Sequence, residues 1–250
     1  MEKQQDKQII DLDEFDSVCS LWQLIPAGSG AGLKKLKLIT ESILNSQIDK
    51  ESPKPLSLII SGKYGKRTHG RCWLRTLGIT DIREIAASTI VDQYALEEFF
   101  HSSTPDTGFI ISNAYNLKDQ LTKSLYQILN EGMLYRYNLN TFQKSSIPVV
   151  GTVVMTTLNT KYINWDLKES FSHQVEIEEY DSTQIQLLCL QRLLYSKIGR
   201  ESDKVLELLT SLRKTFPSII SLLKNSVLIM LSEGDKVLKV EHIEKASYFK

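Results

Sequence analysis

The chain contains 250 residues, which is enough for one large domain or two small ones. Its 30 Lys and Arg residues balance its 30 Asp and Glu residues, which excludes a strong overall field as the basis for binding nucleic acid or a membrane surface. The three cysteines, Cys19, Cys72 and Cys189, are widely spaced, which argues against a zinc site and against a disulfide framework.

The start of the chain predicts an intracellular protein. The first residues, MEKQQDKQ, are polar, and the apolar segment of a signal peptide does not follow them. No stretch approaches the roughly 18 apolar residues of a membrane-spanning helix. With unpaired thiols, these features lead us to expect a cytoplasmic or other reducing compartment and no membrane contact.

Strands and helices are predicted to alternate over most of the chain. Residues 1–20 are polar and acidic and predict a loosely held arm, and apolar periodicity predicts a helix over 33–44. Further helices are expected within 68–77, over 92–100 with Asp92 as the cap, and from Asn116 or Asp119 to Gly132. Short apolar runs predict strands at 56–60, 82–86, 109–111, 134–137, 149–155 and 175–177.

From residue 182 onward the pattern is helical, with helices expected over 182–197, 201–214, 216–232 and 240–247. Alternating strands and helices predict an α/β fold with a parallel sheet covered by flanking helices, and the helical tail predicts a smaller all-α domain. We therefore expect an N-terminal arm (1–20), an α/β core domain (21–180) and a helical lid domain (181–250).

The segment 55–78, PLSLIISGKYGKRTHGRCWLRTLG, joins an apolar strand to a helix through a glycine-rich basic loop. A phosphate-binding loop is built in this way. Its glycines let backbone N–H groups approach the phosphates, a lysine reaches the terminal phosphates, and Ser or Thr binds magnesium. The alternative interpretation is a solvated basic turn between a strand and a helix.

Three alignments of this loop with the phosphate-loop pattern stay open. Counting from Gly62 puts Thr68 at the lysine position and His69 at the hydroxyl position, and a shortened loop would use Gly65 and Lys66 followed by Thr68. None gives the full pattern. The residues kept for a vestigial nucleotide site would be Gly62, Gly65, Lys66, Thr68, Gly70 and Arg71.

The third alignment counts from Gly65 and keeps Gly70 as the second glycine. It puts Arg71 at the lysine position and Cys72 at the hydroxyl position. Arginine does not replace lysine as a compact charge in a tight loop, and a thiol is a poor magnesium ligand. The basic residues over 63–75 leave contact with a nucleic-acid backbone open.

The order of segments resembles an AAA+ ATPase, with the closest resemblance to RuvB-type branch-migration motors and clamp loaders. LSLIISGKYGKRTHG resembles the first strand and phosphate loop, and IREIAAST the second strand. YALEEFFHSSTPDTGFIISNAYNL resembles the helix, spacer and second acidic motif, and LYQILNEGMLYRY the helix and short strand that follow. VVGTVVMTTLNT, DLKESFSHQVEIEEYDSTQI and SEGDKVLKVEHIEKA resemble the first-sensor strand, the arginine-finger region and the last lid helix.

The resemblance covers roughly residues 20–248. It implies a P-loop NTPase-like sheet with a small all-α lid, ATP or ADP with magnesium as the cofactor, and assembly with other AAA+-type subunits, in homo- or hetero-oligomers. Roles in DNA recombination or replication enter through the resemblance alone.

The departures from the family fall where its chemistry is performed. An Asp-Glu pair closes the third strand in the family, and Ser112 and Asn113 stand there in this chain. Neither can act as a base near neutral pH. The arginine-finger region contains Lys168, Glu169 and Ser170. An arginine finger contributes several orders of magnitude to hydrolysis.

Thr156, Thr157 or Asn159 could serve as the first sensor, and Arg200 is the available lid arginine. Threonine and asparagine after a buried strand are also ordinary turn residues, so both interpretations stay open. The histidines have no metal-ligand spacing, and no metal site is expected. The tryptophans, Trp22, Trp73 and Trp165, are expected in the core or in subunit contacts.

Because the loop lysine pattern, both carboxylates and the arginine finger all depart from the family, the sequence favours a pseudo-ATPase with no catalytic residue and no required cofactor. It would be a structural or regulatory subunit of a protein assembly. The alternative is a diverged but active RuvB-like or clamp-loader-type ATPase that uses Lys66 or Arg71 and an acid such as Asp106 or Asp119. A third hypothesis keeps nucleotide binding without hydrolysis.

Overall fold

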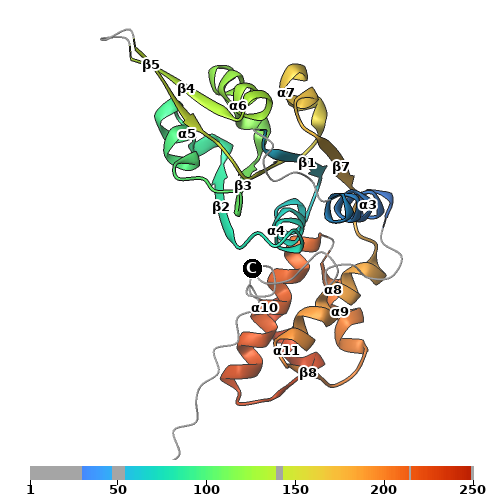
Figure 1. Ribbon diagram of the computed structural model, residues 1–250. Coiled ribbons are helices and arrows are strands. Elements are labelled where there is room, and N and C mark those ends of the chain that lie inside the picture. Colours follow the sequence, from blue (N-terminus) through green and yellow to red (C-terminus); the bar gives the residue numbers. More distant parts are fainter. Residues whose placement is uncertain (1–29, 47–53, 139–142, 214, 249–250) are drawn as a thin grey trace, which may run out of the picture. The chain divides into compact units, whose positions relative to one another are not determined.

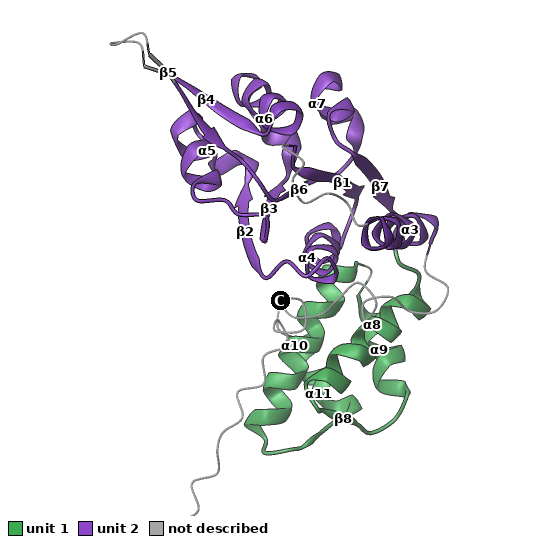
Figure 2. Ribbon diagram, viewed as in Figure 1, with its two compact units in different colours: residues 1–18, 180–250 green, residues 19–179 purple. Residues whose placement is uncertain are grey.

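The computed structural model describes residues 30–46, 54–138, 143–213 and 215–248, so the predicted arm, Cys19 and Trp22 lie outside the described residues. Contacts divide the chain into two compact units (Figure 2). We call residues 19–179 the sheet unit. The second unit, 180–250 with residues 1–18, is called the helical unit.

The sheet unit is built on a five-stranded parallel sheet (Figure 1). Its strands lie in the order β2 (Asp81–Ala86), β3 (Thr107–Ser112), β6 (Thr152–Thr157), β1 (Leu56–Gly62) and β7 (His173–Ile177). The three central strands are buried almost throughout, as parallel strands covered on both faces must be. The α/β fold class predicted from the alternating pattern is confirmed.

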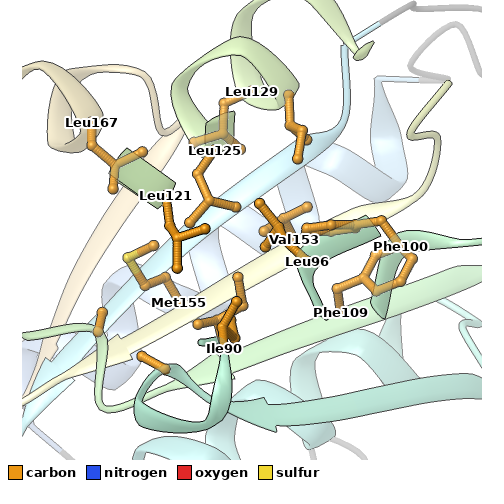
Figure 3. Packing of buried hydrophobic residues seen from close by; sticks show 14 of the residues in the cluster. Ile90, Leu96, Phe100, Phe109, Leu121, Leu125, Leu129, Val153, Met155 and Leu167 are labelled. Carbon is orange, nitrogen blue, oxygen red and sulfur yellow. The ribbon is translucent and has the colours of Figure 1, made fainter. Parts of the chain in front are cut away.

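Helices cover the two faces of this sheet. The helices of the unit are α3 (Ala31–Asn45), α4 (Lys66–Thr76), α5 (Gln93–Phe100), α6 (Asp119–Glu131) and α7 (Trp165–Glu169), with 3-10 turns η1 (Ala87–Thr89), η2 (Ala114–Asn116) and η3 (Thr160–Tyr162). Phe109, Val153 and Met155 pack in one core cluster with residues of α5, α6 and α7 (Figure 3). Residues that alternate with them, such as Val154, face α4 instead, because successive strand residues point to opposite faces.

An antiparallel hairpin of β4 (Met133–Asn138) and β5 (Gln143–Pro148) follows α6. The predicted strand over 149–155 is wrong at its start, since β6 begins at Thr152. Val149 instead donates its N–H to the carbonyl oxygen of Gly132. Gly151 has a φ of 116°, which separates Val149 from the extended backbone of β6.

The helical unit contains α8 (Ser182–Tyr195), α9 (Lys204–Leu212), α10 (Phe216–Ser232) and α11 (Val240–Ser247), around one core cluster. The four predicted helices agree with these within a few residues. The expectation that everything after 182 is helical is wrong in one place, because β8 (Gly199–Arg200) pairs in parallel with β9 (Val237–Leu238). Among the described residues, no helix combines the length and apolar character that crossing a bilayer requires.

Candidate functional site

The loop between β1 and α4 is short. β1 runs to Gly62 and α4 begins at Lys66, so three residues join them. Gly62 has a φ of 138°, and a Cβ there would lie 2.3 Å from the carbonyl oxygen of Ile177. Gly65 is the N-cap of α4 in the left-handed conformation, with a φ of 75°. Both positions therefore require glycine.

This geometry favours the shortened alignment, in which Gly65 and Lys66 are followed by Thr68 in the first turn of α4. The alignment that runs from Gly65 through Gly70 to Arg71 would require residues 66–70 to form the loop, whereas they form the start of α4. A Cβ on Gly70 would lie 3.2 Å from Cγ1 of Val154, so this glycine allows α4 to approach the sheet.

The ammonium group of Lys66 is bound within the loop. Its Nζ donates to the carbonyl oxygen of Gly62 at 2.7 Å and to that of Lys63 at 3.0 Å. Burial lowers the pKa of this ammonium. The lysine that the phosphate-loop pattern assigns to a ligand therefore has two acceptors from its own loop.

Other cations of the basic segment are ion-paired with acidic side chains. Arg71 forms a two-point ion pair with Glu84 of β2, and Arg67 binds the same carboxylate at 2.6 Å. Burial alone would raise the pKa of Glu84, but the hydrogen bonds and charges of Arg71 and Arg67 outweigh it and hold the pKa below its ordinary value. Lys63 lies 3.0 Å from Glu179.

His69 lies in the first turn of α4, and the residue pattern did not predict its structural role beside the loop. It is fully buried, and its Nδ1 donates to the carbonyl oxygen of Gly65 at 2.7 Å, which fixes the tautomer with the proton on Nδ1. Burial lowers the pKa of its imidazole to about 4. A neutral histidine therefore binds the N-cap residue of α4. In the sequence, the feature that could have indicated this role is a histidine one helical turn after the last glycine of the loop.

The end of β3 lies at the same edge of the sheet as the loop and has no carboxylate of its own. Ser112 closes the strand and donates its hydroxyl hydrogen to the carbonyl oxygen of Ile85 at 3.3 Å. Asn113 follows in the left-handed conformation, with a φ of 56°, and is exposed.

The sensor candidates after β6 differ from one another. Thr157 donates to the carbonyl oxygen of Asn159, and the side chain of Asn159 accepts the N–H of Lys161, so both stabilise the turn. Thr156 is 1% exposed, and its hydroxyl has no hydrogen-bond partner among the described residues. It lies on the α4 face of the sheet, two residues after Val154.

Of the two alternative acids, Asp106 is not brought together with the loop. Asp106 precedes β3, whereas the loop follows β1, so in a parallel sheet they lie at opposite edges, about 20 Å apart for a six-residue strand. This excludes Asp106 as a base for the loop. Asp119 is the first residue of α6 and is exposed.

The remaining candidates have structural partners. In the arginine-finger region, Ser170 accepts from Nδ2 of Asn130 at 2.9 Å, and the carbonyl oxygen of Lys168 accepts from Gln174. Arg200 belongs to the helical unit, where it forms an ion pair with Asp203.

One cluster in the helical unit has the composition of a metal site: Glu233, Asp235, Glu241 and His242. Nδ1 of His242 accepts the backbone N–H of Lys239 at 3.0 Å, so Nε2 carries the proton and donates to Asp235 at 3.1 Å. A metal on Nε2 would require a doubly deprotonated ring. The cluster therefore caps the start of α11, and lysine side chains pair with its carboxylates.

Comparisons with known proteins identify the fold. No protein-family model matches the sequence, and no curated protein matches it. The solved structure of the Holliday junction branch migration motor RuvB of Thermotoga maritima aligns with 93% of this chain and 72% of its own, at a TM-score of 0.69 and 16% identity. Two single-residue variants of that protein align over the same shares at TM-scores of 0.71 and 0.70. At this identity the likeness establishes the fold alone, and the AAA+ fold expected from the resemblance is confirmed.

Proposed function

We propose that this protein is a non-catalytic AAA+-like subunit that serves as a structural or regulatory part of a protein assembly. The observation that carries the proposal is the end of β3, where Ser112 and Asn113 stand at the place that the resemblance assigns to a carboxylate pair. Hydrolysis needs a group that holds the magnesium shell and a base that orients the attacking water. A hydroxyl bound to Ile85 and an exposed amide supply neither.

The loop supports the same proposal. Three residues between strand and helix leave fewer backbone N–H groups for phosphates than the full pattern does. Lys66 would have to leave both of its carbonyl acceptors to reach a terminal phosphate. The similar Thermotoga protein is a Holliday junction motor, but the ion pairs of Arg67 and Arg71 with Glu84 reduce the charge available for a nucleic-acid backbone.

The test is phosphate release from ATP with magnesium by the full chain, beside Lys66→Met and the control Lys118→Met. Lys118 is also a lysine bound to a backbone carbonyl, that of Val91, but it precedes α6 and is not part of the loop between β1 and α4. We expect no release above buffer from any of the three proteins. Phosphate release by the unaltered chain that is lost in Lys66→Met and kept in Lys118→Met would overturn the proposal. It would favour a diverged, active RuvB-like ATPase.

The hydroxyl of Thr156 favours a second candidate, nucleotide binding without hydrolysis. This buried group lacks a partner among the described residues and lies on the sheet face beneath α4. A ligand phosphate that accepts its hydrogen would satisfy it. If nucleotide binds, ATP or ADP raises the melting temperature, since a ligand of the folded state stabilises it, and Thr156→Val reduces that shift. Equal melting curves with and without nucleotide would exclude this candidate.

A further inference from the structure

A group of large apolar side chains is exposed at the edge of the sheet where the strands end. These residues follow β2, β3 and β6, and we call them the aromatic rim: Val91, Tyr94, Tyr115, Leu158, Tyr162 and Trp165. Trp165 is 70% exposed and Tyr94 is 65% exposed. Single exposed apolar residues are ordinary, whereas six that follow three adjacent strands at one edge are of the kind that marks a contact surface.

The rim lies over one continuous part of the core. Ile90, Ala114 and Ile163 are chain neighbours of Val91, Tyr115 and Tyr162, and all three belong to the same cluster, together with Met155 and Leu167. Figure 3 shows Ile90, Met155 and Leu167 in this packed group. Because β2, β3 and β6 are adjacent strands, spaced about 4.8 Å apart, the segments that follow them are neighbours in space.

The rim segments carry charged side chains of both signs. Lys118 donates to the carbonyl oxygen of Val91 at 2.7 Å, and Nζ of Lys161 lies 4.9 Å from the ring centroid of Tyr162. Exposed carboxylates stand beside them on the same segments: Asp92, Asp119 and Asp166. A surface for single-stranded nucleic acid would combine aromatic rings with uniform positive charge. Tyrosine and tryptophan among mixed charges are typical of protein interfaces.

We propose that the aromatic rim docks on the aromatic rim of a second copy of this chain, around a two-fold axis. Six large side chains, which are 48% to 70% exposed, offer about 600 Å² per chain, so a pair that covers them would bury about 1,200 Å², the lower limit of specific interfaces. A surface with both signs of charge is self-complementary under a two-fold, because lysines of one copy can face carboxylates of the other. This inference rests on the proposed assembly role and names its surface and partner.

The experiment is sedimentation velocity of the full chain up to about 100 µM, where an interface of this size should give a dimer with a micromolar dissociation constant. Trp165→Lys and Tyr94→Lys should each raise that constant at least about tenfold, since truncated aromatic anchors are the large losses in an interface. Two controls carry the same change at equally exposed leucines elsewhere. Leu38→Lys lies on α3 of the sheet unit and Leu228→Lys on α10 of the helical unit, and both should dimerise as the unaltered chain does.

Several results would overturn the inference. A monomer at every concentration would do so, as would an oligomer larger than a dimer. An increase in the dissociation constant of Leu38→Lys equal to that of Trp165→Lys would also do so. Acrylamide quenching of Trp165, obtained by difference from Trp165→Phe, should fall as concentration rises. Shielding that does not depend on concentration would mean that the chain covers its own rim, which also contradicts the inference. ATP hydrolysis by a dimer would overturn the proposed function alone, whereas an inactive monomer would overturn this inference alone.

Discussion

The loop and the aromatic rim lie at the same edge of the sheet, but they differ in whether their side chains have partners within the chain. At the loop, Lys66 binds two carbonyl oxygens and Glu84 binds two arginines, so polar groups find partners within the chain. At the rim, side chains such as Trp165 stay exposed to solvent. A catalytic site keeps polar groups available for a ligand, whereas a contact surface keeps apolar area available for a partner. The difference favours an assembly role over catalysis.

The largest expected effect comes from forcing the loop to change shape. Gly62→Ala places a Cβ 2.3 Å from the carbonyl oxygen of Ile177 at a φ of 138°, so β1 or β7 must shift. We expect a loss of about 3 kcal/mol in the free energy of unfolding, measured by urea denaturation. Gly78→Ala is the matched control, with a φ of 84° and nothing within 4 Å of the added Cβ, and should lose about 1 kcal/mol.

The next effect in size is expected from a fall in pH, which should lower the free energy of unfolding through His69. Burial lowers its pKa in the folded state to about 4 from its ordinary value of 6.5. The neutral form is therefore favoured by folding. Its contribution is fully present above pH 6.5 and is lost as the pH falls toward 4, by about 3 kcal/mol in total.

Urea denaturation at pH 7 and at pH 4.5 measures this loss. His69→Asn keeps a donor at the position of Nδ1 but does not titrate, so its stability should change less between the two pH values than that of the unaltered chain. Equal pH dependence in the two proteins would contradict the assignment of the effect to His69.

A smaller effect is expected from Glu84, which joins β2 to α4. Glu84→Gln removes the charge that Arg71 and Arg67 share and should cost about 1–2 kcal/mol. Because the pKa of Glu84 is held below its ordinary value, the contribution is present above that value and is lost as the pH falls through the lowered pKa. In acid, the free energy of unfolding of the unaltered chain should therefore approach that of Glu84→Gln.

The smallest effect is expected at the exposed end of the same basic segment. Lys63 pairs with Glu179, and both side chains are at least half exposed, so solvent screens the pair. Glu179→Gln should leave the urea midpoint unchanged. A loss as large as that of Glu84→Gln would contradict the account, because it would mean that exposed and buried pairs stabilise the loop equally.

Much of the fold could be predicted because local signals agree with the tertiary structure. Asp92 caps α5 by accepting the N–H of Ala95, and Gly132 ends α6 with a φ of 68°, as the sequence indicated. The start of β6 was not predictable from hydropathy, since Val149 is as apolar as the strand itself but pairs with Gly132.

The site was less predictable because its features depend on contacts distant in the sequence. Glycine spacing left three alignments of the loop open, and the start of α4 at Lys66 favours the shortened one. Composition could not indicate that Trp73 is fully buried while Trp165 is largely exposed. That distinction depends on which helix face packs on the sheet.

We propose that the edge formed by Lys66, Ser112 and Asn113 performs no hydrolysis. Single-turnover measurement tests it most directly, with the full chain in excess over radiolabelled ATP and magnesium, because one slow cleavage per molecule is then detected. We expect no labelled phosphate beyond that of the buffer control over hours. One equivalent of phosphate, released by the unaltered chain and lost in Lys66→Met, would contradict it.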